Sequence, residues 1–416
     1  MEVKGLPEAP GNRRLVPPFT GEPSELRESI RSFVERELAP RADQWEEERW
    51  FPDSVFERMG ELGFLGLDKP EEYGGQGGDA VHEAVLAEEL ARCGSAGLAA
   101  GIGAHVAIAT PPVWKFGTED QRQRYVVPAI KGQRIAALGI TEPDAGTDVA
   151  SLRTRAEKVE GGWQVNGEKT YITNGVRAGF LVAAVRTGGE SHDGISFLII
   201  DTDQPGYRSS KLEKLGMHAS DTALISLEDV FVPEENLLGE AGGGFKLIMA
   251  NFQWERLFMT LGSVAGMERC FERTLEFALE REAFGRPIGN FQSIRHKFAG
   301  MATTIEAGRA VTYHALRRFV AGEDATREVT IAKLKTQRDA FEVADTCLQI
   351  HGGAGYMVEY GIERAARDAR LGPIGGGTDE IMREILGKLS GLSDEVGSRA
   401  DPIRRNRQEW PQPSPP

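Results

Sequence analysis

The chain is poor in cysteine and in long apolar runs, and each shortage excludes a class of protein. Only three of its 416 residues are cysteine, Cys93, Cys270 and Cys347. Their number and spacing fit neither a disulfide framework nor a metal site, so we expect buried thiols in a reducing compartment and no metal. No uninterrupted apolar run approaches the roughly 20 residues that cross a membrane, and residues 1–18 lack the apolar core of a signal peptide. We therefore expect a cytoplasmic protein without an integral membrane segment.

Positive charge is also in short supply. The chain has 63 Asp and Glu against 49 Lys and Arg, a net charge of −14 at pH 7. This excess argues against nucleic acid or an anionic membrane as the main partner, although a local basic patch for a phosphate stays open. A hydrophobic content of 40% supplies a core, and the length allows two or three domains or one large helical domain with an insert.

The apolar pattern divides the chain into three parts with polar ends. Residues 23–135 have helical spacing over residues 24–60, 80–92 and 99–116. Residues 136–240 read as short strands and turns, at residues 163–167, 180–185, 195–200, 224–227 and 230–232. Residues 241–395 are helical again, over residues 245–281, 291–321, 326–350, 358–367 and 378–389. We predict a mainly α fold with a central β domain and a final helical bundle, with residues 1–22 mobile and residues 396–416 disordered.

Two segments of the β part carry groups suited to a polar ligand. In residues 139–148, the hydroxyls of Thr141 and Thr147 can face a ligand edge, although an ordinary loop explains them equally well. In residues 169–175, Tyr171 and Thr173 share one face of a strand. There an aromatic ring can stack on a planar group and a hydroxyl can bond a heteroatom. The alternative is a hairpin edge with a tyrosine that faces solvent.

Candidate phosphate-binding groups follow two predicted helices. The guanidinium of Arg281 suits a phosphate, although a cation that meets a helix C-terminus explains this residue alone. Gly352 and Gly353 allow main-chain amides to approach a ligand closely. They follow a helix and lack the G-x-G-x-x-G spacing of a dinucleotide-binding strand. His351 has no metal-spaced partner, and we interpret it as a structural residue rather than a base.

Glu255 interrupts an apolar helical face. At three-and-four spacing, the same face carries Ile248, Phe252, Met259, Gly262 and Gly266. A buried carboxylate is costly unless it is neutral, paired or catalytic, and loss of water raises its pKa toward that of a general base. The residues alone leave a structural Glu–Arg pair as the alternative.

These segments together resemble the acyl-CoA dehydrogenase family, from about residue 26 to 392. The strongest likeness lies in residues 367–381, which resemble its C-terminal signature. Most members read Tyr-Glu-Gly-Thr there and use the Glu as catalytic base, whereas residues 375–378 read Gly-Gly-Gly-Thr. The isovaleryl-CoA and long-chain enzymes carry the base on an earlier helix, in a Glu-Arg-Leu triplet that residues 255–257 match. The resemblance therefore accounts both for the missing Glu at position 376 and for the Glu at position 255.

The resemblance implies FAD-dependent conversion of an acyl-CoA to a trans-2-enoyl-CoA. Glu255 would remove the α-proton, the backbone N–H of Gly376 would polarise the thioester carbonyl, and Arg256 would steady the base or the CoA. Gly375 would widen the pocket beside the reacting carbons. The positions that match the family's FAD contacts, where Tyr171 replaces the usual Trp, are Thr141, Thr147, Tyr171, Thr173, Arg281, Phe284, Gln292, Gln349, Gly352, Gly353 and Thr378.

The resemblance also implies architecture and partners. We expect an N-terminal helical domain, a middle β-barrel and a C-terminal four-helix bundle, with FAD sites shared between subunits of a homotetramer or homodimer. An electron-transferring flavoprotein would accept the electrons, in fatty acid or branched-chain acyl metabolism. Two alternatives are a flavin-dependent monooxygenase or oxidase on the same fold, and a non-catalytic scaffold that binds acyl-CoA. Acyl length, branching, and CoA against a carrier-protein thioester stay open at this stage.

Overall fold

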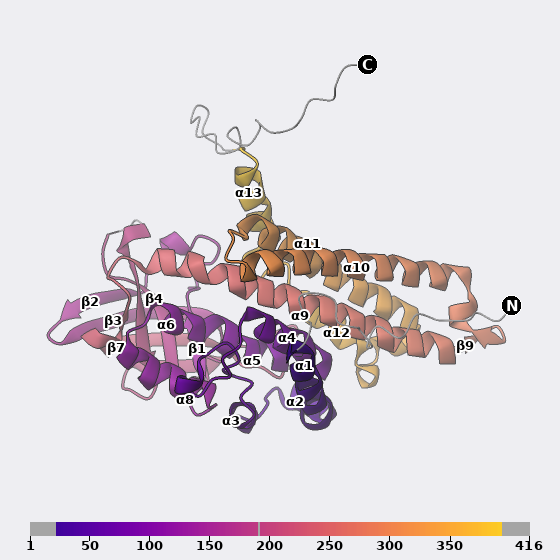
Figure 1. Ribbon diagram of the computed structural model, residues 1–416, viewed down its shortest axis with the longest axis horizontal. Helices are drawn as coiled ribbons and strands as arrows, with labels where there is room; N and C mark the ends of the chain where they lie inside the picture. The colour runs from indigo at the N-terminus through magenta and orange to yellow at the C-terminus, as the bar shows by residue number, and fades with distance from the viewer. Residues whose placement is uncertain (1–21, 190–191, 393–416) are drawn as a thin grey trace, which may run out of the picture.

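The computed structural model follows the predicted order of a helical part, a β part and a second helical part (Figure 1). It describes residues 22–189 and 192–392. The mobile segment predicted for residues 1–22 and the tail predicted for residues 396–416 therefore lie outside the described residues, apart from Glu22, which begins the first helix. The predicted fold class, mainly α with a central β domain, is confirmed.

The N-terminal part is built of short helices. They are α1 (Glu22–Phe33), α2 (Ala42–Glu48), α3 (Ser54–Glu61), α4 (Ala80–Leu90), α5 (Ala96–Gly103), α6 (Thr110–Phe116), α7 (Glu119–Gln121) and α8 (Val127–Ile130). The continuous helical pattern predicted for residues 24–60 was wrong near residue 50, because Arg49 adopts a left-handed conformation that ends α2. Pro52 follows three residues later, where the chain turns toward α3.

One helical stretch of the described chain, Ala96–Phe116, is long and apolar enough to cross a membrane by length and composition alone. In the structure, 78% of its most apolar window is buried inside the protein. A core helix of this kind passes the same test as a membrane span.

The middle part is a single eight-stranded sheet. Its strands are β1 (Ala136–Gly139), β2 (Arg155–Val159), β3 (Gly162–Thr173), β4 (Phe180–Arg186), β5 (Ile195–Asp201), β6 (Tyr207–Lys211), β7 (Thr222–Pro233) and β8 (Leu237–Leu238). The hydrogen-bonded order is β6-β7-β3-β2-β4-β5-β8, and β1 pairs with β4 in parallel. Every residue of β4 is buried, which explains its unbroken apolar run. The two strands predicted for residues 224–232 form one strand, β7.

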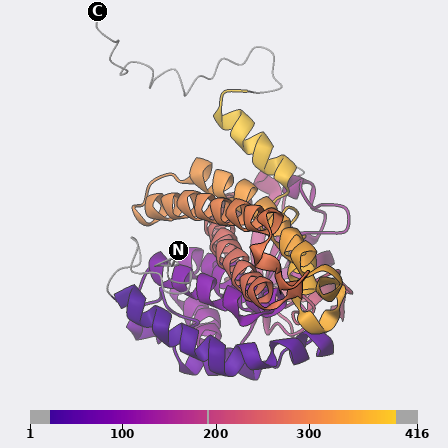
Figure 2. The same ribbon diagram turned by 90° about the vertical axis from the view of Figure 1, so that its right-hand side faces the viewer.

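The C-terminal part packs three long helices side by side (Figure 1). Its elements are α9 (Gly244–Glu280), α10 (Gln292–Val320), α11 (Thr326–His351), α12 (Ile362–Ala369), α13 (Asp379–Leu389) and a small hairpin of β9 (Glu282–Ala283) and β10 (Arg286–Pro287). The helix predicted from residue 358 begins only at Ile362, because Gly361 takes a left-handed conformation after a 3₁₀ turn. Both views show α13 projecting from the rest of the chain (Figure 2).

Helix α9 connects all three parts. Near its start, Ile248 packs in the core between the sheet and α6. Further along, Leu257 and Leu261 pack in the N-terminal helical core, and Val264 and Met267 belong to the core of the bundle. Its 37 residues span about 55 Å. Residue 255 therefore lies where the three parts meet.

Candidate active site

Glu255 is a buried carboxylate without a structural partner. The residue is 9% exposed, and its Oε2 atom has no hydrogen-bond partner among the described residues. No ion pair of Glu255 occurs in the described part of the chain either. Burial raises the pKa of Glu255 to about 7, although the nearby charges of Arg256 and Lys333 act in the opposite direction. The structural Glu–Arg pair is therefore not observed, and the carboxylate is available as a base.

The glycine turn of residues 375–377 faces this carboxylate. A Cβ atom placed on Gly376 would lie 3.8 Å from Glu255 Oε1 and 2.8 Å from Met259 Sδ. Gly376 and Gly377 have φ of +63° and +94°, a region that favours glycine. A side chain at position 376 would therefore enter the space beside the Glu255 carboxylate, from the opposite side.

Two cations hold this turn. Arg256 Nε donates to the carbonyl oxygen of Gly376 at 2.9 Å, and Lys333 Nζ donates to that of Gly377. Arg256 thus contacts the turn directly, a contact that the sequence did not predict. Lys333 was not predicted as a site residue at all. The sequence signal that could have identified it is its place within the apolar stretch of residues 331–334. In the structure this lysine is completely buried.

The end of strand β3 forms a second candidate surface. Thr170 N donates to Thr141 O at 2.9 Å, so the loop that holds Thr141 lies beside this strand. A buried ion pair between Lys169 and Glu142, 2.7 Å apart, fixes the same loop. Tyr171 is 70% exposed with φ of +61°, at a register shift of the strand. The strand is therefore not regular at Tyr171, because a bulge interrupts its pairing between Lys169 and Ile172. Thr147, further along the loop, is exposed.

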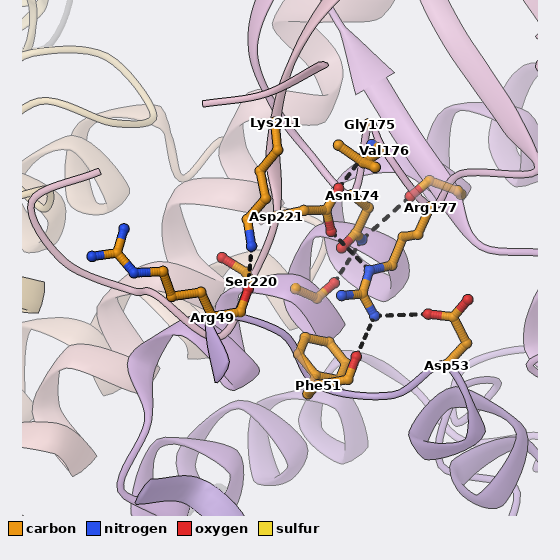
Figure 3. Close-up of polar contacts among 12 residues, drawn as sticks. Arg49, Phe51, Asp53, Asn174, Gly175, Val176, Arg177, Lys211, Ser220 and Asp221 are labelled. Carbon is orange, nitrogen blue, oxygen red and sulfur yellow. Dashed lines mark hydrogen bonds and ion pairs between the residues drawn. The ribbon is translucent and has the colours of Figure 1, made fainter. Parts of the chain in front are cut away.

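A buried network anchors the turn that follows β3 (Figure 3). The Asp221 carboxylate accepts from Val176 N at 2.8 Å and from Arg177 Nε at 2.7 Å. Arg177 Nη1 donates to Phe51 O and to Asp53, each at 2.8 Å. This network ties the end of β3 to the segment between α2 and α3.

The same turn also contacts α5. The buried Asn174 donates from Nδ2 to Gly101 O at 2.8 Å. The guanidinium carbon of Arg177 lies 3.7 Å from the centre of the Trp50 ring. Hydrogen bonds and stacking therefore hold the turn against the N-terminal helices.

The remaining cofactor candidates gather at the far end of the bundle. Phe284 is 96% exposed and meets Phe291 edge to face, with ring centroids 6.1 Å apart. A Cβ atom on Gly352 or Gly353 would meet nothing within 4 Å, so this backbone is open to a ligand. Exposed side chains at the same end belong to Arg281, Gln292 and Gln349.

His351 lies next to this group. It stacks on Phe277 with ring centroids 4.2 Å apart, and its Nδ1 pairs with Cys347 O at 2.8 Å. Burial lowers the pKa of His351. The prediction of a structural histidine is therefore confirmed, as is that of three buried thiols without disulfides.

The two groups of cofactor candidates are far apart within one chain. Arg281 follows Glu255 by 26 residues, all but the last of them in the continuous helix α9, a distance of about 39 Å. Figure 1 shows the β9 hairpin at one end of the molecule and the sheet at the other. Thr378 caps α13 through its hydroxyl, just after the glycine turn, and so lies apart from Arg281.

Comparison with known proteins identifies the family. Models of the N-terminal, middle and C-terminal domains of acyl-CoA dehydrogenases match residues 20–133, 137–230 and 242–390. A probable acyl-CoA dehydrogenase of Bacillus subtilis is 39% identical over 89% of this chain and 98% of its own length. The mitochondrial isovaleryl-CoA dehydrogenase of Solanum tuberosum is 37% identical over 89% and 90%. A crystal structure of a probable acyl-CoA dehydrogenase from Mycobacterium abscessus superposes with a TM-score of 0.87 at 44% identity, over 89% of this chain and 99% of that one.

The chain belongs to the acyl-CoA dehydrogenase family. It is an oxidoreductase that uses FAD to introduce an α,β double bond into an acyl-CoA thioester. The donor set fits this cofactor: hydroxyls and an exposed aromatic ring suit the flavin, and an exposed arginine with an open glycine backbone suits the diphosphate. The monooxygenase, oxidase and scaffold alternatives are not favoured.

Proposed function

We propose that Glu255 is the general base that removes the α-proton of the acyl-CoA. The observation that carries this role is the 3.8 Å between Glu255 Oε1 and the Cβ position of Gly376. By the sequence resemblance, position 376 holds the base in most of the family. A carboxylate from α9 therefore reaches the place that a glutamate at 376 would occupy. Its pKa of about 7 suits proton transfer near neutral pH.

The glycine turn supplies the complementary charge stabilisation. The N–H of Gly376 would donate to the thioester carbonyl and stabilise the enolate charge that develops as the proton leaves. Arg256 fixes this residue through its carbonyl oxygen. When bound, FAD supplies the acceptor for the hydride of the β-carbon.

The cofactor contacts are proposed in two groups. Thr141, Thr147, Tyr171 and Thr173 would surround the flavin part, and Thr378 would contact it beside the glycine turn. A second copy of the chain would supply the diphosphate and adenosine contacts, because the bundle-end group lies too far from Glu255 in its own chain. The proposed contributors from that second copy are Arg281, Phe284, Gln292, Gln349, Gly352 and Gly353. A homodimer or homotetramer follows from this division.

The pocket favours branched or bulky acyl groups. Residues 375–377 carry no side chain, and a Cβ atom on Gly375 would meet only Leu371 within 4 Å. Gly262 and Gly266 leave similar space along α9. Among the relatives, isovaleryl-CoA, 2-methylacyl-CoA and long-chain acyl-CoA dehydrogenases of plants and rodents are 35–37% identical to this chain. We propose a substrate of one of these kinds.

The remaining assignments extend this function. We propose an electron-transferring flavoprotein as the physiological acceptor and the cytoplasm as the compartment. We also propose domain boundaries at residues 135/136 and 240/241, since β1 begins at Ala136 and α9 at Gly244.

A dye-reduction screen with straight and branched acyl-CoAs tests the proposal. The purified chain should carry FAD, reduce dye fastest with a branched or bulky thioester, and consume little oxygen. Glu255→Gln should keep FAD but lose about 10²- to 10⁴-fold in rate or more, because the general base is gone. Near-normal turnover of that variant, in a preparation with full flavin, would refute the assignment of the base.

A further inference from the structure

The glycine turn opposite Glu255 is anchored from two different helices. Arg256 on α9 bonds the carbonyl oxygen of Gly376, and Lys333 on α11 bonds that of Gly377. Both glycines adopt left-handed φ values and have no side chain to restrict them. The two anchors therefore fix the two peptides that directly follow the N–H of Gly376.

Lys333 is an unusual residue for a structural anchor. Its side chain is completely buried, and loss of water lowers the pKa of its ammonium to about 8. A buried charge is costly unless it is paired, so an uncharged donor would hold a carbonyl at lower cost. The charged groups that act on its pKa are Asp379 and Glu380 of α13 and Arg256 and Glu255 of α9.

The neighbouring carboxylate already has another partner. Asp379 Oδ2 accepts from Arg338 Nη2 at 2.6 Å, on the same helix as Lys333. Lys333 donates its hydrogen bond instead to the carbonyl oxygen of Gly377 in the glycine turn. Its positive charge acts on Glu255 together with that of Arg256, in the direction that lowers the pKa of this carboxyl. The charge of Lys333 therefore acts on the Asp379 carboxylate and also on Glu255, the proposed base.

We propose that Lys333 is a positioning residue for α-proton removal: it fixes the glycine turn so that the N–H of Gly376 faces the substrate carbonyl, and its charge favours the ionised form of Glu255. The proposal rests on the proposed function, in which Glu255 is the base. Arg256 performs the equivalent anchoring one residue earlier. The charge of Lys333 and its hydrogen bond are two separable contributions.

Lys333→Met tests both contributions together. Removal of a nearby cation raises the pKa of a carboxyl, so the acid limb of the kcat/KM profile should move up by about one pH unit or less. The plateau above that limb should fall roughly 10- to 100-fold, because the oxyanion donor is no longer held in place. Exchange of the substrate α-proton in D₂O, measured by mass spectrometry, should slow in parallel.

Two further variants separate the contributions. Lys333→Gln keeps a donor for Gly377 without the charge, so the limb should move while the plateau is largely kept. Lys333→Arg keeps the charge in a different shape, so the limb should stay and the plateau should fall. Lys335→Met is the matched control on the same helix, since Lys335 pairs with Asp339 and not with the turn. This control should change neither the acid limb nor the plateau of the kcat/KM profile.

The outcomes distinguish this proposal from the assignment of the base. If Glu255→Gln exchanges the α-proton like the unmodified chain, the proposed function fails. If Glu255→Gln is inactive but all three Lys333 variants keep the unmodified limb and plateau, only the role of Lys333 is overturned. A lowered plateau with an unmoved limb in Lys333→Gln would overturn the contribution of the charge. Circular dichroism and flavin content confirm that each compared variant is folded.

Discussion

At the scale of residues, the proposed base and the position that carries it in most of the family lie 121 residues apart in sequence. Glu255 lies on α9, and Gly376 lies in the turn before α13. The carboxylate is buried without a hydrogen-bond partner for Oε2, an arrangement that destabilises the fold and suits a base. Two consequences follow, one for stability and one for the possibility of moving the base.

The stability of the chain should depend on pH through Glu255. Its pKa is raised from 4.5 to about 7 in the folded state, so the folded state retains a proton that the unfolded state loses. Stability associated with this group is present below pH 4.5 and is lost as the pH rises to about 7. Glu255→Gln, which cannot ionise, should therefore be more stable than the unmodified chain at pH 8, by on the order of 2 to 3 kcal/mol relative to their difference at pH 4.5.

Urea unfolding at the two pH values measures this difference. Glu276→Gln is the control, because Glu276 is exposed on the same helix, and it should show no such dependence. Equal effects of the two substitutions would contradict a raised pKa at Glu255.

The catalytic carboxylate should be transferable from position 255 to position 376 if a second substitution makes room for it. Glu255→Gly together with Gly376→Glu should restore part of the activity that Glu255→Gly loses, because the two positions share one space. The structure adds an obstacle: Met259 Sδ would lie 2.8 Å from the new Cβ atom, and φ of +63° costs a non-glycine residue about 1 to 3 kcal/mol. Met259→Ala in the same chain should therefore increase the restored activity.

The variant with the carboxylate at position 376 should be compared on branched and on straight acyl-CoAs. The new side chain fills the space beside Gly375, so branched acyl-CoAs should regain less activity than straight ones. Suppose that the variant with the moved base is folded and loaded with flavin and yet is no faster than Glu255→Gly on any acyl-CoA. That outcome would contradict the idea that positions 255 and 376 place a carboxylate in the same space.

At the scale of elements, the end of β3 is held by contacts from outside the sheet. Arg177 joins Asp221 to the segment between α2 and α3, and its guanidinium stacks on Trp50. Asn174 joins the same turn to α5. The proposed flavin contacts Tyr171 and Thr173 thus belong to a strand whose end is fixed by the N-terminal helices.

Arg177→Met should destabilise the chain and weaken FAD retention. It leaves the Asp221 carboxylate, which is fully buried, without its cation, a loss that typically costs about 3 to 5 kcal/mol. Thermal unfolding and flavin content after dialysis measure the two effects. The control is Arg208→Met, because Arg208 is 72% exposed on strand β6 of the same sheet; it should change neither the unfolding temperature nor the flavin content. If Arg177→Met is destabilised but retains its flavin fully, the Arg177 network contributes to folding stability and not to FAD binding.

At the scale of the whole molecule, the proposed cofactor contacts fall into two separate groups, one beside the sheet and the glycine turn and one at the β9 end of the bundle (Figure 1). The exposed Phe284, the open glycine backbone at Gly352 and the projecting helix α13 (Figure 2) present uncovered surface. Leu389 and Leu392 add exposed apolar side chains at the end of α13. The proposed second copy of the chain would cover this surface and complete the divided contacts.

Mixed oligomers test whether the site is shared. Arg281→Ala should reduce FAD retention, because it removes a phosphate donor, and Glu255→Gln should remove the base. If Arg281 serves a neighbouring chain, co-expression of these two variants under different tags produces one site with both defects and one intact site. The purified mixed oligomer should then be more active than either variant alone. If Arg281 served its own chain, no site in the mixture would be intact, and the mixture would be no more active than the Arg281→Ala variant.

The sequence by itself determined the order of the parts and most helix ends, because these depend on local spacing and on capping residues. It also placed Glu255 on an apolar face and, through the resemblance, paired it with the glycine at 376. Local rules failed where a residue left its usual conformation, as at Arg49, Tyr171 and Gly361. A single left-handed residue redirects the chain without changing the apolar pattern on either side.

Only the tertiary structure decided which distant groups meet. The position of Lys333 beneath the glycine turn and the stacking of Arg177 on Trp50 depend on how helices and strands pack. Periodicity assigns a residue to a face, but it does not say which element covers that face. The span of α9 likewise places Arg281 far from Glu255, and the proposal of a site shared with a second chain depends on this distance.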